Sequence, residues 1–214
     1  MPTGVVRATI LLLMSGSVWL ACGGGTPFHA SPVASFSTSP EGVAIAGVTI
    51  VVFSATASDP GGGALTLTWD FGDGASGSGA SVTHVYSSAG VFPISLSVRD
   101  ARGGAAAVGS KVTVGSLSGR WLLSEGGGRF YERGYDLVQA GADLGGQPFA
   151  GPDKGCLGAL AGVVTSPRQL SFRFVGCDNE TVVISGIADE SLLSVSGTYT
   201  HPSGPPQPIV LSRE

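Results

Sequence analysis

Glycine and proline occur too often along this chain for long helices to form. The 214 residues include 35 glycines and 13 prolines, nearly twice the ordinary combined share of about 12%, and both residues weaken helix interiors. Hydrophobic residues still make up 43% of the sequence, which is more than a disordered polar segment contains. The composition therefore predicts an all-β protein with many turns.

The chain carries few charges. Charged residues make up 12% of the sequence and the formal net charge is −4, whereas domains that bind nucleic acid are usually basic. We therefore expect no nucleic-acid partner. The length of 214 residues suits one large domain or two small ones, and the patterns described next favour two.

Residues 1–21 have the layout of an export signal. Arg7 precedes an apolar run over residues 8–20, which ends at the small residue Ala21. The run is shorter than the roughly 20 residues that a membrane-spanning helix needs. The segment therefore predicts export and no permanent membrane span.

Leu20, Ala21 and Cys22 resemble the end of a bacterial lipobox, in which the signal is cut before a cysteine that receives lipid. The resemblance implies a lipid-anchored protein of the bacterial cell envelope. Gly23 after the cysteine favours the outer membrane, with the chain facing the periplasm or the cell surface. The glycine-rich residues 22–31 then form a flexible tether. An ordinary secretory signal with an incidental cysteine is the alternative.

Cys156 and Cys177 are the other two cysteines. An even pair in an exported chain predicts a disulfide, which would close a loop of about 22 residues and stabilise the fold by roughly 3 kcal/mol in the chain-entropy model. Two buried free thiols are the alternative. No histidine lies at ligand spacing from either cysteine, so we expect no metal site here.

Residues 32–116 alternate apolar and polar side chains with the period of β-strands. Leu65, Leu67, Trp69 and Phe71 share one face of a strand, and residues 92–98 repeat the pattern. Turn residues separate these runs. Further strands are predicted near residues 34–37, 48–55 and 105–114. Together they predict an antiparallel β-sandwich of the immunoglobulin type.

Part of this segment resembles the PKD (polycystic kidney disease) domain, an immunoglobulin-like sandwich. Residues 68–74 read T-W-D-F-G-D-G, and H-x-Y-x-x-x-G-x-F-x-I-x-L-x-V-x-D begins at His84. The motif residues are Trp69, Asp70, Phe71, Gly72, Asp73, Gly74, His84, Tyr86, Gly90 and Asp100. The resemblance implies that they serve mainly the fold. It also implies an extracellular module that contacts protein or carbohydrate, or acts as a spacer.

The residue types of the motif predict particular roles. Trp69 and Phe71 should fill core volume, and the two glycines after them should adopt the positive φ of a tight turn. The neighbouring aspartates should accept backbone N–H bonds in that turn. His84 and Tyr86 should carry buried rings whose polar tips need partners.

Two more specific interpretations of this region have less support from the sequence. A G-x-G-x-x-G pattern begins at Gly72, but no helix that could hold a pyrophosphate is predicted after it. Carboxylates at the sandwich ends could offer oxygen ligands to Ca²⁺, although capping of turns is their commoner role. These carboxylates belong to Asp59, Asp70, Asp73 and Asp100.

Residues 117–214 predict a small antiparallel β-barrel. Alternating segments fall near residues 119–124, 135–140, 142–148, 157–165, 169–175, 181–188, 192–200 and 208–213. Short polar turns should pair neighbouring segments as a meander. Gly162, Gly186 and Gly197 lie within strands, where a missing Cβ lets the sheet curl toward closure.

The same segment resembles the lipocalin and calycin barrels in the residues Gly119, Arg120, Trp121 and Arg213. In those barrels a G-x-W tryptophan closes one end under an arginine. The resemblance implies barrel closure by Trp121 and Arg213, and it permits an apolar ligand inside. A small eight-stranded barrel can equally be filled by its own side chains. Residues 126–134, with aromatics and cations, are a candidate binding loop or a loop of incidental composition.

No catalytic residues and no cofactor are predicted. The sequence lacks the G-x-S-x-G, H-E-x-x-H and C-x-x-C motifs, and its histidines are isolated. Asp189 and Glu190 fall at a hairpin tip, where water should keep both pKa values near normal. The sequence thus predicts a non-catalytic, membrane-anchored binding or spacer protein with an extracellular protein or polysaccharide as partner. A lipocalin-like carrier of a small apolar ligand is the alternative.

Overall fold

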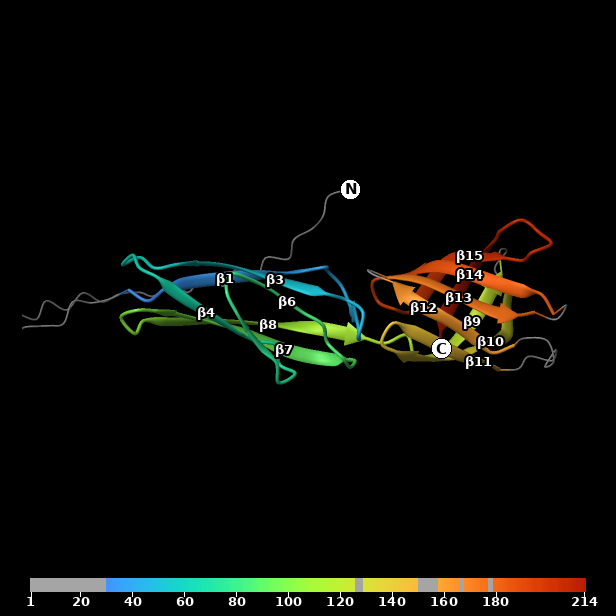
Figure 1. Ribbon diagram of the computed structural model, residues 1–214, viewed down its shortest axis with the longest axis horizontal. Coiled ribbons are helices and arrows are strands. Elements are labelled where there is room, and N and C mark those ends of the chain that lie inside the picture. The colour runs from blue at the N-terminus through green and yellow to red at the C-terminus, as the bar shows by residue number, and fades with distance from the viewer. Residues whose placement is uncertain (1–29, 126–128, 150–157, 166–167, 177–178) are drawn as a thin grey trace, which may run out of the picture. The chain divides into compact units, whose positions relative to one another are not determined.

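The computed structural model describes residues 30–125, 129–149, 158–165, 168–176 and 179–214. Every regular element in these ranges is a β-strand (Figure 1). The all-β fold class predicted from the composition is confirmed. Within the same ranges no helix is long and apolar enough to cross a membrane.

The chain divides into two compact units. The first takes the residues up to Glu41 together with Val51–His84 and Phe92–Val112. The second takes Gly42–Ile50, Val85–Val91 and Thr113–Glu214. Each unit is described by itself. The domain bounds 22–31, 32–116 and 117–214 stay predictions.

Two β-sheets build the sandwich. One sheet has the order β1 (Val33–Ser39), β3 (Val51–Ser58), β6 (Ser81–His84). The other has the order β2 (Ala44–Ile45), β8 (Ala105–Gly115), β7 (Gly90–Asp100), β4 (Leu65–Asp70), β5 (Ser76–Ser78). Strand β2 pairs with β8 in parallel, whereas β3 pairs with β1 and β6, and β4 with β5 and β7, antiparallel. The predicted immunoglobulin-like sandwich is confirmed.

Trp69 lies at the centre of the aromatic core of this sandwich. Its ring meets Phe36 edge-on at a centroid distance of 5.1 Å and lies 5.5 Å from Phe53, separations at which aromatic pairs attract beyond the area they bury. Its indole Nε1 donates to the backbone oxygen of Gly79 at 2.9 Å. The predicted core role of Trp69 thus comes with a partner for its polar atom.

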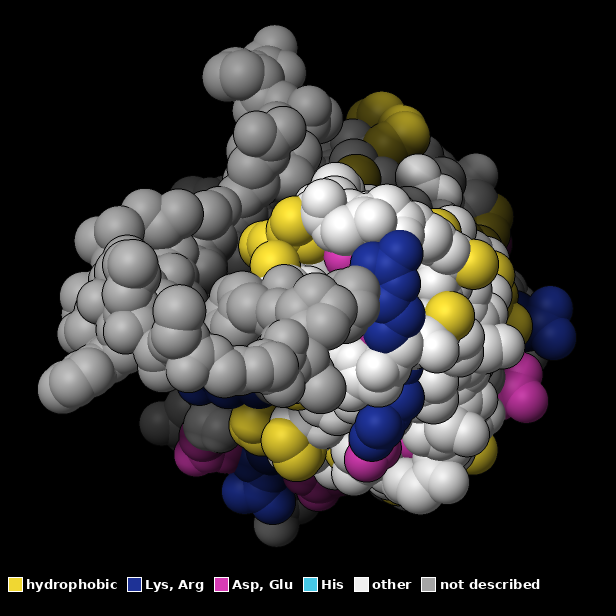
Figure 2. Space-filling view, turned by 90° about the vertical axis from the view of Figure 1, so that its left-hand side faces the viewer, with side chains coloured by type: hydrophobic (Ala, Val, Ile, Leu, Met, Phe, Trp, Pro, Cys, Tyr) yellow, Lys and Arg dark blue, Asp and Glu magenta, His cyan; other side chains and the backbone are white. Residues whose placement is uncertain are grey.

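Charged side chains are sparse on the surface as well as in the composition. Figure 2 shows one face, on which Lys and Arg side chains lie close to Asp and Glu side chains. Most of the described surface between them is uncharged. The charges on this face thus form no broad patch of one sign.

Eight strands of the second unit form a closed barrel. The order around the barrel is β10, β11, β12, β13, β14, β15, β16, β9, and every pairing is antiparallel. The bounds are β9 (Gly119–Glu125), β10 (Arg129–Ala140), β11 (Asp143–Phe149), β12 (Leu160–Thr165), β13 (Gln169–Val175), β14 (Thr181–Ala188), β15 (Ser194–Thr200) and β16 (Gln207–Arg213). The predicted barrel is confirmed.

The expectation of a surface loop over residues 126–134 is wrong from Arg129 onward, and residues 126–128 lie outside the described ranges. Strand β10 begins at Arg129 and pairs with β9, with a register shift between Phe130 and Gly134. The shift places extra residues in β10, so the alternation that marks a strand is interrupted there. A Cβ on Gly134 would lie 1.8 Å from the Trp121 backbone oxygen, so the strands approach closely beside the bulge.

The strand glycines of the barrel lie where neighbouring backbones nearly touch. A Cβ on Gly197 would lie 2.1 Å from the Ser185 oxygen, and one on Gly186 would lie 2.9 Å from the Ser196 oxygen. Gly186 and Gly197 are also direct cross-strand partners. Only residues without a side chain allow β14 and β15 to come this close.

Substitution of Gly197 by Ala should therefore destabilise the barrel. We expect Gly197→Ala to lower the free energy of unfolding by about 1–3 kcal/mol, because its Cβ can fit only if backbone atoms move. Gly145→Ala is the matched control, since a Cβ there would meet nothing within 4 Å. Urea titration of both variants checks this, and equal stability of the two would contradict it.

Candidate functional site

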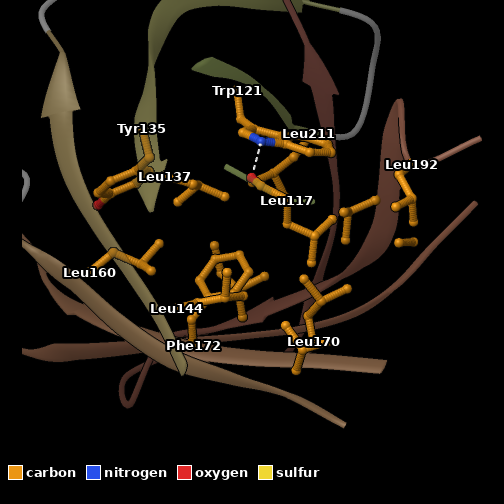
Figure 3. Close-up of a cluster of buried hydrophobic side chains, with 14 of the residues drawn as sticks. Leu117, Trp121, Tyr135, Leu137, Leu144, Leu160, Leu170, Phe172, Leu192 and Leu211 are labelled. Carbon is orange, nitrogen blue, oxygen red and sulfur yellow. Dashed lines mark hydrogen bonds between the residues drawn. The ribbon is translucent and has the colours of Figure 1, made fainter. Parts of the chain in front are cut away.

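The interior of the barrel is filled by its own side chains. Inward positions of the strands carry large apolar residues that are almost fully buried (Figure 3). They include Trp121, Leu123, Tyr135, Leu137, Leu144, Leu160, Leu170, Phe172, Ile184 and Leu211. Across the described part of the barrel the inward side chains thus form one packed core, as in other small eight-stranded barrels.

Trp121 and Arg213 lie on paired strands at one end of this core. They are register partners in the β9–β16 pairing. The Trp121 ring is fully buried, and its Nε1 donates to the Leu117 backbone oxygen at 2.8 Å (Figure 3). The Arg213 guanidinium donates to the backbone oxygens of Ser116 at 3.0 Å and Ser118 at 2.6 Å. The structure thus brings together the two residues predicted to close the barrel.

Arg213 should stabilise the barrel through the shape of its guanidinium as well as through its charge. Arg213→Lys keeps the charge but cannot reach both carbonyls with one planar fork, so we expect a loss of about 1 kcal/mol in the free energy of unfolding. Arg173→Lys, on an exposed outward position of β13, is the control. Chemical denaturation measures both, and an Arg213→Lys variant as stable as the wild type would refute this role.

The outer face of β12 to β16 is almost free of charge. The outward positions over residues 161–165, 169–175, 181–187, 196–200 and 208–210 carry small hydroxyl, amide and aliphatic side chains. Arg173 is the charged residue among them. Ordinary protein surfaces carry about a quarter to a third of charged residues, so this neutral face is unusual.

An open groove of about 450 Å³ lies on this neutral face. Seven outward side chains line it, namely Thr165 at the end of β12 and six more in two rows across β13, β14 and β15, and we call it the hydroxyl groove. One row pairs Gln169 with Ile187 and Ile187 with Ser196; the other pairs Ser171 with Ser185 and Ser185 with Thr198. The sequence alone does not reveal this site, because four separate strands supply residues that look like an ordinary solvent face.

The barrel carries charge on another part of its outer surface. Arg120 on β9 donates to Asp136 at 3.0 Å and lies 3.6 Å from a Glu214 oxygen. Its guanidinium also lies 4.5 Å from the centre of the Phe149 ring. The hydrogen bond to Asp136 and the charge of that residue raise the pKa of Arg120. This cation is therefore engaged by its own neighbours.

In the sandwich, the motif aspartates cap the turn that follows β4. Asp70 accepts from the backbone N–H of Gly72 at 2.9 Å, and Asp73 accepts from that of Ala75 at 3.1 Å. Gly72 and Gly74 have φ values of 79° and 93°. The capping and the positive φ are those expected from the residue types.

His84 joins this turn from β6. Its Nε2 lies 2.6 Å from Asp73 Oδ2, and its ring stacks on Phe71 at 4.5 Å with an interplanar angle of 5°. Burial by itself raises the pKa of Asp73, but hydrogen bonds from His84 and Ala75 and the charge of His84 outweigh it and lower the pKa below 3.8. The Asp73 carboxylate thus links the turn that follows β4 to strand β6.

The other aspartates of the sandwich also cap turns. Asp59 accepts from the N–H of Gly61, and Asp100 accepts from those of Arg102 and Gly104. The part of the chain that the structure describes contains no group of three or more metal-ligating side chains. Tyr86 is buried, and Gly90 begins β7.

The link through Asp73 makes a stability prediction with a defined pH dependence. Because the pKa of Asp73 is lowered on folding, its contribution is present above the ordinary value of 3.8 and is lost as the pH falls through the lower folded-state pKa. Asp73→Asn should cost about 1 kcal/mol at pH 6 and less at pH 2. Unfolding at both pH values tests this, and a difference that stays constant would contradict it.

The expectation of a near-normal pKa at Asp189 is wrong. Burial by itself raises the pKa of this carboxyl, but bonds from the Leu193 N–H at 2.9 Å and from Ser191 and Ser194 lower it. The tip between β14 and β15 folds back on the carboxylate, and Leu192 adopts a φ of 58° there. Asp189 is thus a turn cap of the same kind as Asp73.

Three predicted site residues lie outside the described residues. These are Cys22, expected to carry lipid, and Cys156 and Cys177, expected to form a disulfide. Their roles stay predictions.

The sandwich, with its central tryptophan and aspartate-capped turns, defines an immunoglobulin-like domain. Residues 29–114 match the family model of the PKD domain, and this part of the chain is a PKD domain. The microbial collagenase of Vibrio alginolyticus is 35% identical over 79 residues, which is 37% of this chain and 10% of that protein. The chain therefore spans about a tenth of the length of this relative.

Solved structures similar to this chain include two PKD domains. The PKD1 domain of Vibrio anguillarum Epp is 27% identical and covers 42% of this chain and 99% of its own, with a TM-score of 0.36. The PKD1 domain of Vibrio cholerae metalloprotease PrtV is 30% identical and covers 40% and 98%, with a TM-score of 0.34. A carbohydrate-binding module of the β-sandwich superfamily is 15% identical and covers 87% and 93%, with a TM-score of 0.40.

Proposed function

We propose that this chain is a non-catalytic binding or spacer protein of the bacterial cell envelope. The packed interior of the barrel carries the proposal, because it leaves recognition to the outer surfaces of the molecule. The PKD domain supports it, since its chemistry-bearing side chains are engaged in capping turns. An extracellular protein or polysaccharide is the proposed partner.

The barrel argues against the alternative of a lipocalin-like carrier. A ligand-binding pocket usually has several hundred Å³ of concave space that buries most of the ligand. Trp121, Tyr135 and Phe172 instead occupy the interior with almost no exposed area. A small apolar ligand could enter only if such side chains moved out of a packed core.

The proposed location rests on the leader and on Cys22. An apolar run after Arg7, followed by Leu20, Ala21 and Cys22, suits export and lipidation. Anchors of this type combine several acyl chains, and one chain alone holds a protein only marginally. We propose that the lipid holds the chain at the outer membrane, with residues 22–31 as the tether.

The lipid anchor can be tested in the bacterial host. Cys22→Ala should abolish incorporation of a labelled fatty acid into the chain, whereas Cys177→Ala should retain it, because only Cys22 is the proposed lipid site. Mass spectrometry of the mature wild type should show an N-terminal cysteine with added acyl mass. An unmodified N-terminus at another residue would overturn the anchor.

A further inference from the structure

We propose that the hydroxyl groove on the outer face of β13, β14 and β15 binds a neutral polysaccharide chain. This inference rests on the proposed function and names the ligand class and the surface. The groove has a volume of about 450 Å³, and all of its lining residues are uncharged. A ligand with formal charge would find no ion-pairing partner among them.

The side chains of the groove match the chemistry of sugars. Ser171, Ser185, Ser196 and Thr198 present hydroxyls that both donate and accept, and Gln169 adds an amide. These are the capacities that neutral sugar hydroxyls need in a partner. All five lie at exposed outward positions of β13, β14 and β15, so these groups face away from the barrel core.

Ile187 supplies an apolar contact in the same groove. Its side chain is 58% exposed, and it lies in register between Gln169 and Ser196. A sugar ring has C–H groups on its faces and hydroxyls on its rim. Ile187 can therefore pack against a ring face while the neighbouring polar groups bind the rim.

The dimensions of the groove suit a chain rather than a single small group. Adjacent strands lie about 4.8 Å apart, and outward residues two apart along a strand lie about 6.7 Å apart. Three strands and two rows therefore span roughly 10 Å by 7 Å. The groove is open to solvent, so a segment of a longer polymer can reach it.

The closed barrel disfavours an extended peptide as the ligand. Peptides that join a sheet by backbone hydrogen bonds need an unpaired edge strand. Strands β9 to β16 pair all the way around, so the described barrel offers no such edge. A peptide would have only side-chain contacts here, without the charges that usually give such contacts their specificity.

The test uses the whole mature chain and affinity electrophoresis in gels that contain a soluble neutral polysaccharide. Dextran, mannan and xylan are the probes, and dextran sulfate and gelatin are the anionic and polypeptide comparisons. We expect retardation by at least one neutral probe, unchanged in 0.5 M NaCl because no charge pair is involved. Ser185→Glu should weaken it at least tenfold.

Thr181→Glu is the matched control, because it adds the same charge at an exposed outward position of β14 away from the groove. Ile187→Ser should weaken binding, whereas Val183→Ser, also exposed on β14, should not. Circular dichroism of each variant checks that the barrel is folded.

Three outcomes would overturn the proposal. The first is that the chain binds gelatin or dextran sulfate and that Ser185→Glu abolishes this binding. The second is that it binds a neutral probe but that Ser185→Glu and Ile187→Ser leave the binding unchanged. The third is that none of the neutral probes retards it. The second outcome would leave the proposed binding function standing and move the site elsewhere. The fatty-acid labelling of the Cys22 variant tests the proposed anchor independently of all three.

Discussion

The pairing of β9 with β16 is the constraint on which the barrel depends. An antiparallel meander of eight strands leaves its first and last strands as edges unless they meet, and exposed edges recruit other chains. Here they meet in a register that places Trp121 opposite Arg213. The buried indole and the guanidinium then bond to backbone oxygens of the segment that leads into β9, so closure and core packing support each other.

Because the barrel is closed, its inner and outer faces have different requirements. Inward positions are filled with Trp, Tyr, Phe and Leu side chains, while the strand glycines let β14 and β15 approach where a Cβ would collide with backbone. Outward positions are then free of any packing requirement. A face that needs neither core volume nor an edge can carry small polar side chains, as β13 to β15 do.

Strand bounds were predictable where alternation and turn chemistry agree. Strands β13 and β14 begin and end at the predicted residues, because polar turns bracket uninterrupted alternation. The start of β10 was missed because the bulge before Gly134 breaks the period. That glycine is the one signal that the backbone approaches another strand there.

The candidate site was less predictable than the fold. Ser171, Ser185 and Thr198 are neighbours only through the register of three strands, and that register depends on the details of two turns. The bonds to Asp189 were missed for a related reason, because the backbone of the turn folds back on a carboxylate that its sequence places in water. In both cases the contacts depend on how the strands and turns are arranged, which the residue types alone do not determine.

Affinity on a hydroxyl-lined surface has a physical limit that favours a repeating ligand. Each neutral hydrogen bond contributes only about 0.5–1.5 kcal/mol net, and an open groove buries little apolar area. A polymer with many equivalent sites, met by many chains held on one membrane, converts weak single contacts into avidity through high effective concentration. The proposed anchor at Cys22 and the proposed polysaccharide site therefore support each other, since neither would retain a polymer at the envelope by itself.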